Sequence, residues 1–517
     1  MSDIVSRERP WPDLERPATL RRLRVSNAGL VKATLLCALA PIAIFAIFLQ
    51  PLAAASLLTG GALIAALILW GWAPGERLSA PLDFSLYAGC LAISLALCLL
   101  GGEDHLFYAT WDWYTRDAVL ADLVNNKFPV LYRYQGADFV LRAPLAMYMA
   151  PAAIGWAYGL RAAHLALLLQ NAFLFGAIFY LLASLTSGLK LRFLALFLMS
   201  GPMDAVPQLV QCLLKGEVVH PHFMFWNPLA SFWAQLPQLF WAPNHAFSGW
   251  MIGTLCLLRM GREIDIAILA ISSIILLFWS PLSLIGAAPL LLAAGWKSLS
   301  PALLRPRTAV AALGGAFMLP LLAYFSLDAA TLSRGWLFEK QSFFLWYPLA
   351  LVFGLPQLWL LLLARKEIPD RLKPTFFAVG VILVLFPLYR FGATSLDNEM
   401  AMRGILTPMF LLGVIFAEVA PRLIDGRRAY AVATLAIVMA SAMTATMEIR
   451  RALSDPPYEI NDCNLLTATG KILSYPLPSN YLAHVEKAPA WLVSTQGRRL
   501  EIEQRQCWPG FALMEGK

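Results

Sequence analysis

The sequence predicts an all-α protein: a polytopic bundle of transmembrane helices followed by a small polar C-terminal cap. Of its 517 residues, 59% are hydrophobic and only 14% are charged, whereas soluble domains carry about 25% charged residues. Apolar runs recur along nearly the whole chain. A run of about 20 apolar residues spans a bilayer as a helix, because its backbone groups must pair internally. We expect about 13 to 15 such spans.

The basic residues predict an orientation rather than a nucleic-acid partner. The net charge is +8, and the Lys and Arg residues lie mostly in short loops, where they set the topology of a membrane protein. The N-terminal segment, residues 1–27, is polar and carries Arg21, Arg22 and Arg24 just before the first span. It lacks the short apolar core and the cleavage site of a secretory signal. We expect this segment to be cytoplasmic and no nucleic acid to bind.

The predicted membrane domain covers residues 28–447 and begins with three spans that place residues 101–143 on the outer side. Gly249 and Gly253 are spaced for close helix packing within one of the later spans. The predicted spans are at about 30–49, 52–72, 84–100, 144–159, 164–185, 191–214, 246–258, 264–279, 282–296, 309–327, 344–364, 375–388, 405–420 and 430–447.

The region between residues 186 and 245 is the hardest to divide. The apolar run 191–214 is interrupted by a Gly-Pro pair at residues 201–202, and a short or re-entrant helix is predicted at about 223–241. Broken helices at membrane depth are tolerated where they line a cavity. This division leaves Lys190 and Arg192 on the outer side, against the usual bias of basic residues toward the cytoplasm.

The outer loop 101–143 is predicted to hold a short helix at about 115–128 that lies on the membrane interface. Its apolar side chains recur with helical spacing, which places them on one face. Aromatic side chains at its start are expected to anchor it at the level of the lipid headgroups. These aromatic residues are Trp111, Trp113 and Tyr114.

The C-terminal tail, residues 448–517, is polar and contains proline turns and short strand-like runs, one of them at 500–503. It is predicted to form a small extracytoplasmic cap. Of seven cysteines, only Cys463 and Cys507 lie outside the apolar part of the chain. In an extracytoplasmic tail we expect these two to form a disulfide.

Ionisable and polar residues gather on the predicted outer face. Charges near a membrane are costly, so each needs a partner or a function. The candidates are Glu103, Asp104, His105, Asp112, Arg116, Asp117, Asp204, His245, Asp397, Asn398, Glu399 and Arg403.

Asp112 has two interpretations of about equal weight. It stands at a predicted helix start between two tryptophans, with Arg116 four residues further on. A helix cap with an i,i+4 ion pair would explain it, with about 1 kcal/mol from the cap. Alternatively, it is a catalytic carboxylate at the membrane edge that accepts a proton from a hydroxyl group.

The run Glu103, Asp104 and His105 suggests either a divalent metal site or a solvated loop. Adjacent residues do not readily converge on one ion, so the solvated loop is favoured.

Arg403 also has two interpretations. It is either a positive charge at the end of a span, paired with the nearby Asp397 or Glu399, or a residue that binds a phosphate, for which the planar guanidinium of arginine is suited. The sequence contains no phosphate-binding glycine loop and no dinucleotide fingerprint, which argues against cytoplasmic nucleotide chemistry.

Three segments of the predicted membrane domain stand out together. They are Trp111-Asp112-Trp113-Tyr114-Thr115-Arg116-Asp117, Trp241-Ala242-Pro243-Asn244-His245 and Leu396-Asp397-Asn398-Glu399-Met400-Ala401-Met402-Arg403. With these segments the chain resembles the GT-C class of integral membrane glycosyltransferases, of the bacterial type that depends on polyprenyl-phosphate sugars. The resemblance covers residues 28–447 and not the tail. The class often carries its first acidic loop after the first span, whereas here this loop follows the third, and there is no clean Asp-x-Asp.

The resemblance implies an enzyme of the bacterial inner membrane that transfers a sugar from a polyprenyl-phosphate donor to a glycan or lipid acceptor on the extracytoplasmic face. Asp112 would act as the catalytic base, with Asp117 or Asp104 as substitutes. The donor phosphate would be held by Arg403, with Arg116 and His245. The resemblance leaves open a divalent cation, Mg²⁺ or Mn²⁺, and implies no other cofactor.

Two other functions share this compartment. A lipid-linked glycan transporter, or flippase, would carry charges in the middle of its spans and internal repeats, and Asp204 is the main charge of that kind. An O-antigen-type polymerase usually carries a large, Arg-rich outer loop late in the chain, whereas the loops at 328–342 and 390–403 are short. Charges concentrated on the outer face favour the transferase.

Overall fold

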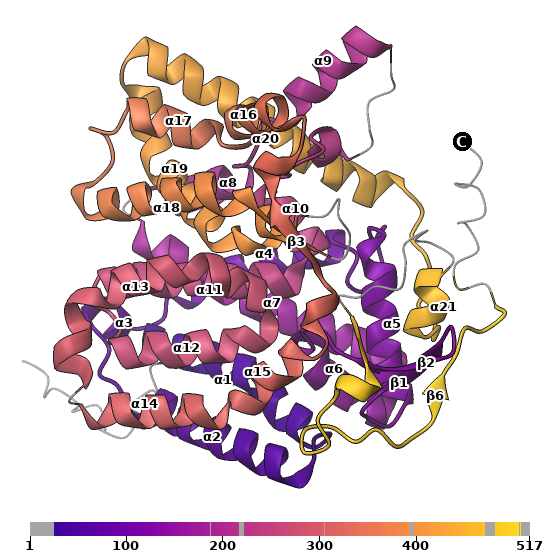
Figure 1. The fold of residues 1–517 in the computed structure, drawn as a ribbon. Helices are drawn as coiled ribbons and strands as arrows, with labels where there is room; N and C mark the ends of the chain where they lie inside the picture. The colour runs from indigo at the N-terminus through magenta and orange to yellow at the C-terminus, as the bar shows by residue number, and fades with distance from the viewer. Residues whose placement is uncertain are drawn as a thin grey trace, which may run out of the picture.

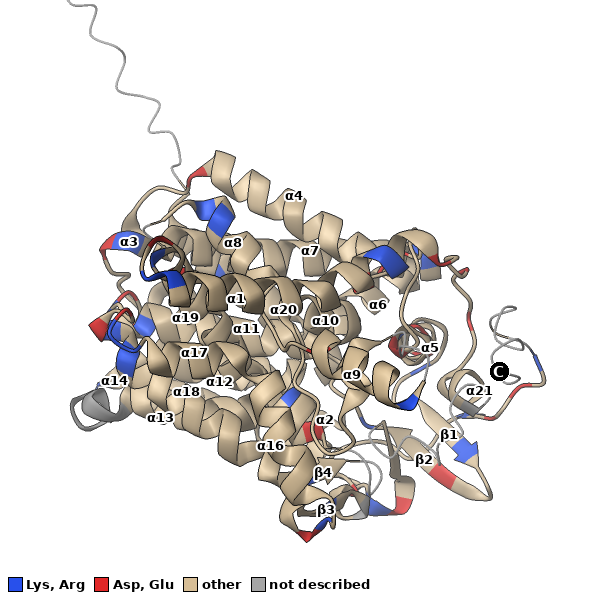
Figure 2. Ribbon diagram, turned by 90° about the horizontal axis from the view of Figure 1, so that it is seen from above, with Lys and Arg blue, Asp and Glu red and all other residues tan. Residues whose placement is uncertain are grey.

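The computed structural model describes residues 25–186, 188–216, 222–303, 305–392, 398–470, 481–505 and 507, and these are mostly helical (Figure 1). Most of the long helices run between two ends of a bundle, which we call the α3 end and the α5 end after helices that lie there. Figure 2 shows that the charged residues gather mainly at these two ends, with a largely uncharged band between them. The predicted helical bundle is confirmed.

The α-helices are α1 (Asn27–Ala46), α2 (Pro51–Trp70), α3 (Glu76–Ser79), α4 (Phe84–Leu100), α5 (Asp112–Asn125), α6 (Ala146–Tyr158), α7 (Leu160–Leu185), α8 (Lys190–Leu198), α9 (Ala205–Lys215), α10 (Gln235–Trp241), α11 (Pro243–Met260), α12 (Ile266–Trp279), α13 (Pro281–Leu303), α14 (Pro306–Phe317), α15 (Leu319–Ser326), α16 (Phe343–Gly354), α17 (Pro356–Leu363), α18 (Lys373–Leu385), α19 (Leu406–Asp425), α20 (Arg428–Ser454) and α21 (Leu465–Gly470).

Short helical turns and strands lie in the connections. The turns are η1 (Phe223–Trp226), η2 (Ala329–Thr331), η3 (Leu337–Glu339), η4 (Asp370–Leu372), η5 (Phe386–Leu388), η6 (Met400–Gly404) and η7 (Val485–Lys487), and the strands are β1 (Leu131–Tyr134), β2 (Ala137–Leu141), β3 (Ser333–Trp336), β4 (Tyr389–Gly392), β5 (Leu482–His484) and β6 (Arg499–Leu500).

Within the described residues, seven helices are long and apolar enough to cross a membrane, and the bent pair α16–α17, with a bend of 69°, makes an eighth candidate. Several long apolar helices of this kind characterise a multi-pass membrane protein. These candidates are fewer than the 13 to 15 spans expected from the sequence, because other predicted spans form shorter apolar helices. These are Phe84–Leu100, Ile266–Trp279 and Pro281–Gly295.

The segment 144–159, predicted to be a span, does not run from one end of the bundle to the other. The helix formed there, α6, has only 13 residues, and both of its ends lie at the α5 end. Before its start, the Ala143 amide donates to the Tyr324 hydroxyl at the end of α15. After its end, Arg161 pairs with Asp104 of the outer loop, with 3.0 Å between Nη2 and Oδ2. The first half of α6 is buried against other helices, whereas Ile154, Trp156 and Tyr158 in its second half are exposed.

This correction reverses the direction of α7. The helix starts at the α5 end and finishes at the α3 end, where Arg77 donates to the Leu185 carbonyl at 3.4 Å. The next residue, Thr186, donates to Glu418 near the end of α19. Lys190 and Arg192 therefore lie at the same end of the bundle as Arg77, and not at the α5 end where the prediction placed them.

We expect cysteine labelling in membranes to show this topology. Arg77, Arg161 and Arg192 all lie in exposed positions. In a background free of the five unpaired cysteines, an impermeant maleimide is expected to label Arg192→Cys and Arg77→Cys from one side of the membrane and Arg161→Cys only from the other. Labelling of Arg192→Cys and Arg161→Cys from the same side would contradict the arrangement.

The region 191–241 also differs from its prediction. The expected span 191–214 is divided into α8 and the separate helix α9, whose exposed residues include Leu213 and Leu214. In Figure 1, α9 projects from the bundle beside α16 and α20. Instead of one helix over 223–241, the chain forms η1 and α10. The predicted packing by Gly249 is confirmed, because a Cβ there would lie 3.0 Å from the Leu406 side chain of α19.

The C-terminal segment packs against the outer loop at the α5 end. Strands β5 and β6 flank the hairpin β1–β2 in one sheet of order β5-β2-β1-β6, so the predicted strand at 500–503 is found slightly earlier. A disulfide joins Cys463 to Cys507. The Leu492 carbonyl accepts from the Gln50 amide at the start of α2. The tail is thus tied to the bundle at several points.

Candidate functional site

Helix α5 carries the first candidate residues and is buried on nearly all sides. The side chains of Trp113 and Tyr114 are 0% and 4% exposed, and the Trp113 indole donates to the Phe240 carbonyl. The expectation that they anchor an interfacial helix among lipid headgroups is therefore wrong. The polar side chains of α5 form hydrogen bonds and ion pairs with other parts of the protein instead of with water. Trp111 keeps 42% of its surface exposed.

Asp112 is the first residue of α5 and does not cap it. The cap position is Trp111, and no side-chain capping hydrogen bond forms at this terminus. The Asp112 carboxylate lies between two arginines: Oδ2 is 3.6 Å from Arg116 Nη2 and 3.7 Å from Arg403 Nη2. These are ion-pair distances, longer than a hydrogen bond. The side chain is 29% exposed, so the carboxylate is open to an incoming molecule.

Arg116 is a structural cation. It is 2% exposed, and its guanidinium donates to the Trp241 carbonyl at 2.7 Å and to Asn244 Oδ1 at 2.9 Å. That carbonyl closes α10, where the last carbonyls of a helix have no partner within the helix. Arg116 thus holds the break between α10 and α11 against α5. The segment Trp241–His245, which the sequence singled out, lies at this break.

Arg403 reaches the site from the late outer loop. It lies in η6 just before α19, is 18% exposed, and pairs with Glu399 one turn earlier as well as with Asp112. The structure therefore brings together two of the three segments that carried the resemblance, and Arg116 brings the third. Asp397 lies outside the described residues. Asn398 has a structural role, since its amide donates to the carbonyls of Leu229 and Pro387.

His245 lies beside this group at the start of α11. Its Nδ1 is 2.7 Å from the Ser280 hydroxyl, and its carbonyl accepts from Ser283 of α13. Arg403 and Arg116 are both close enough to act on it electrostatically. His245 is therefore a neighbour of the arginine pair rather than a contact of Asp112.

The C-terminal segment adds Tyr481, which sequence reasoning missed. This tyrosine interacts electrostatically with Arg116, Arg403 and Asp112, and burial raises the pKa of its hydroxyl. Its carbonyl accepts from the Arg142 amide at 2.6 Å. No pattern in the tail marked this residue, because only folding brings it next to η6.

Asp104 and Asp117, the predicted substitutes for Asp112, do not lie in its group. Asp104 pairs with Arg161, and Asp117 with His105 at 3.1 Å. Glu103 accepts from Asn171 at 3.0 Å and is 1% exposed, with Asp104 and His105 9% exposed. The favoured solvated loop is therefore wrong.

Asp204 is also separate from the site. It stands at the break between α8 and α9, where its Oδ1 accepts a hydrogen bond from the Trp226 indole at 2.8 Å.

A further buried cluster includes Trp241, whose indole donates to Glu448 at 3.1 Å. Glu448 also pairs with His222 and Arg451. Sequence reasoning placed Glu448 at the start of the tail, whereas α20 continues to Ser454.

Asp122 of α5 is expected to make the stability of the α5 end depend on pH. Burial raises the pKa of its carboxyl to about 7, although the Tyr132 hydroxyl and the Leu465 amide donate to it. A raised folded-state pKa means that this contribution to stability is complete below pH ~4 and is lost as pH rises toward ~7. At ~1.4 kcal/mol per unit, the loss is on the order of a few kcal/mol.

The measurement is the thermal unfolding midpoint between pH 5 and pH 8. Asp122→Asn keeps an oxygen for both donors and cannot ionise, so its midpoint is expected to fall less with rising pH than that of the wild type. Asp138→Asn, on the exposed β1–β2 hairpin, is the matched control. Wild-type and Asp122→Asn curves that stay parallel over this range would refute the assignment.

Comparison with known proteins returned no match: no protein-family model, no curated protein and no solved structure is similar to this chain. The candidate site, which we call the Asp112 site, consists of Asp112, Arg116, Glu399, Arg403 and Tyr481.

Proposed function

We propose that this protein is a membrane glycosyltransferase that moves a sugar from a polyprenyl-phosphate donor to a glycan or lipid acceptor. The observation that carries the proposal is the partly exposed side chain of Asp112 next to the partly exposed side chain of Arg403. A proton acceptor and a phosphate-binding cation, contributed by distant loops, meet at the charged end of an apolar bundle. That is where the headgroup of a lipid-linked sugar would lie when its tail remains in the bilayer.

In the proposed reaction, the acceptor oxygen forms a bond to the anomeric carbon of the sugar. The bond between that carbon and the phosphate oxygen breaks, and the phosphate leaves with the bonding electrons. Asp112 takes the proton of the acceptor hydroxyl as general base. The leaving phosphate gains negative charge in this step, and a positioned arginine stabilises such a charge most where water is excluded.

We assign the donor phosphate to Arg403 rather than to Arg116. Arg403 is 18% exposed, whereas Arg116 is 2% exposed and already donates to Trp241 and Asn244. Arg116 is thus a positioning residue that orients Asp112 by their ion pair. The ion pair with Glu399 orients the guanidinium of Arg403, whose planar fork suits bidentate binding of a phosphate.

We further propose that the α5 end faces the extracytoplasmic side of a bacterial inner membrane, with the C-terminal segment as an extracytoplasmic cap. Two observations support this orientation. Basic residues of the connecting loops, such as Arg77, Lys190 and Arg422, lie at the α3 end, as the positive-inside bias predicts for the cytoplasm. The disulfide Cys463–Cys507 lies in the segment that packs on the α5 end, and disulfides persist in oxidising compartments.

The test is turnover of synthetic polyprenyl-phosphate sugars by the purified protein in detergent, with water or a simple sugar as acceptor. Consumption of one donor with release of polyprenyl phosphate is the expected result. The same donors with heat-inactivated protein give the background. If no donor is consumed and the protein instead moves lipid-linked glycans across liposomes, the proposal fails and the transporter takes its place.

A further inference from the structure

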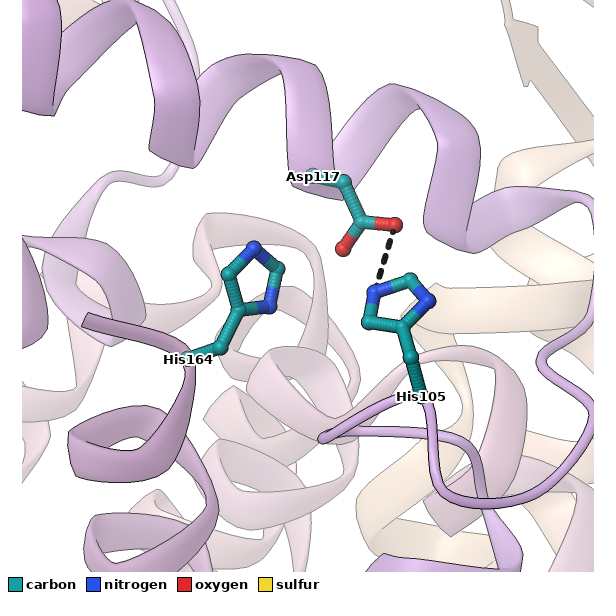
Figure 3. A group of neighbouring side chains, drawn as sticks. All are labelled: His105, Asp117 and His164. Carbon is teal, nitrogen blue, oxygen red and sulfur yellow. Dashed lines mark ion pairs between the residues drawn. The ribbon is translucent and has the colours of Figure 1, made fainter. Parts of the chain in front are cut away.

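We propose that His105, Asp117 and His164 bind a divalent transition metal of the zinc class. The three side chains come from the loop after α4, from α5 and from α7, and they converge on one point (Figure 3). One ligand atom from each lies within 4.8 Å of the others. All three residues are buried, with His164 0% exposed. The site is separate from the Asp112 site and does not depend on the proposed glycosyl transfer.

The tautomer of His105 suits metal binding. Its Nδ1 is 3.0 Å from the Tyr458 carbonyl, which can only accept, so Nδ1 carries a proton. In the neutral ring, Nε2 then presents a lone pair toward Asp117 Oδ2 at 3.1 Å. Histidine ligands of metals commonly donate their other N–H to a backbone carbonyl in this way.

An ion pair between His105 and Asp117 does not account for the buried imidazole of His164. If His105 were protonated, it would satisfy Asp117 without a metal. Among the described residues, neither ring nitrogen of His164 has a hydrogen-bond partner of good geometry, although the main chain of Glu103 is close enough for a weak hydrogen bond. Asp117 Oδ1 likewise has no hydrogen-bond partner in the part of the chain that the structure describes. Buried polar atoms are almost always paired, because an unpaired one has lost its hydrogen bonds to water without replacement.

The ligand set selects the metal. Two imidazoles and one carboxylate suit Zn²⁺ and similar ions, whereas Mg²⁺ and Ca²⁺ prefer oxygen ligands. With metal–ligand distances of ~2.0–2.2 Å, tetrahedral ligand atoms lie roughly 3.4 Å apart. Small side-chain rotations would bring the three atoms from their present separations to that distance, and a water would complete the tetrahedron.

The metal would fix the position of α5 relative to α7 and to the loop after α4. It would tie the outer loop, α5 and α7 together, and through Tyr458 it would reach the C-terminal segment, because Tyr458 contacts both His105 and Asp117. Since Asp112 and Asp117 are on the same helix, the metal would also determine where Asp112 lies relative to Arg403.

The test uses the full-length protein in detergent, stripped with a chelator and titrated with Co²⁺, whose tetrahedral complexes absorb strongly in the visible. The expected result is one tetrahedral Co²⁺ per chain, displaced by Zn²⁺, and a higher unfolding temperature with metal than without. His164→Ala is expected to weaken binding by more than ~100-fold, because losing even an outer-shell partner costs ~10–100-fold. His484→Ala, a histidine paired with Asp328 outside the cluster, should bind like the wild type.

Two outcomes would overturn the proposal. One is a wild-type protein that shows no tetrahedral Co²⁺ band and no thermal shift with metal, which would leave a simple His105–Asp117 ion pair. The other is a His164→Ala variant that binds Co²⁺ as tightly as the wild type. If His164→Ala does not fold, the wild-type spectrum and thermal shift still decide, and Asp117→Asn provides the second variant. None of these measurements requires catalytic turnover.

Discussion

Replacing Asp112 with asparagine is expected to lower sugar transfer by about 100-fold or more, the scale on which a lost general base acts. The change keeps the size of the side chain and removes its ability to take a proton. Because the Asp112 side chain is 29% exposed and its ion pairs with the two arginines are long, at 3.6 and 3.7 Å, folding should be little affected. The measurement is donor consumption per enzyme molecule at saturating donor, beside the unfolding temperature.

The matched control is Asp138→Asn. Asp138 also lies between two arginines, 2.9 Å from Arg133 and 3.0 Å from Arg499, but it stands on the β1–β2 hairpin away from the Asp112 site. Its loss should leave turnover within a few-fold of the wild type. Equal turnover of the wild type and Asp112→Asn would remove Asp112 as the base, while keeping the reaction if the donor is still consumed.

The substitution Gly286→Ala is expected to displace the segment that carries Arg403. Gly286 of α13 packs directly on η6, and a Cβ at this position would overlap the carbonyl oxygen of Gly404. That atom belongs to backbone and cannot rotate away, so α13 and η6 must separate. Overpacking of this kind costs about 1–3 kcal/mol or more, and a shift of ~1 Å in a catalytic geometry can cost ~100-fold in rate. Unfolding temperature and turnover should both fall.

Gly89→Ala is the corresponding control. Gly89 is inside α4, and a Cβ there meets nothing within 4 Å, so the better helix propensity of alanine should leave stability unchanged or slightly higher. If Gly286→Ala matches Gly89→Ala in stability and turnover, the tight contact between α13 and η6 does not position Arg403.

The segments that meet at the Asp112 site were visible in the sequence, but their roles were not. Asp112, Arg116 and Arg403 stood out because charged residues next to apolar spans are rare. Sequence spacing alone did not show that Arg116 is buried and bound to Trp241, or that Asp117 turns away toward His105. His164 and Tyr481 went unnoticed, since each contributes through neighbours far along the chain.

The sequence by itself determined that this is a multi-pass helical protein, and it placed helices such as α1, α2 and α4 to within a few residues. Long apolar runs must form helices in lipid whatever their neighbours are. Only the tertiary structure decided that both ends of α6 lie at the α5 end, that α7 runs from there toward the α3 end, and that α5 is buried. An apolar segment has the same hydropathy whether lipid or protein covers it, so burial by other helices becomes visible only when the helices pack.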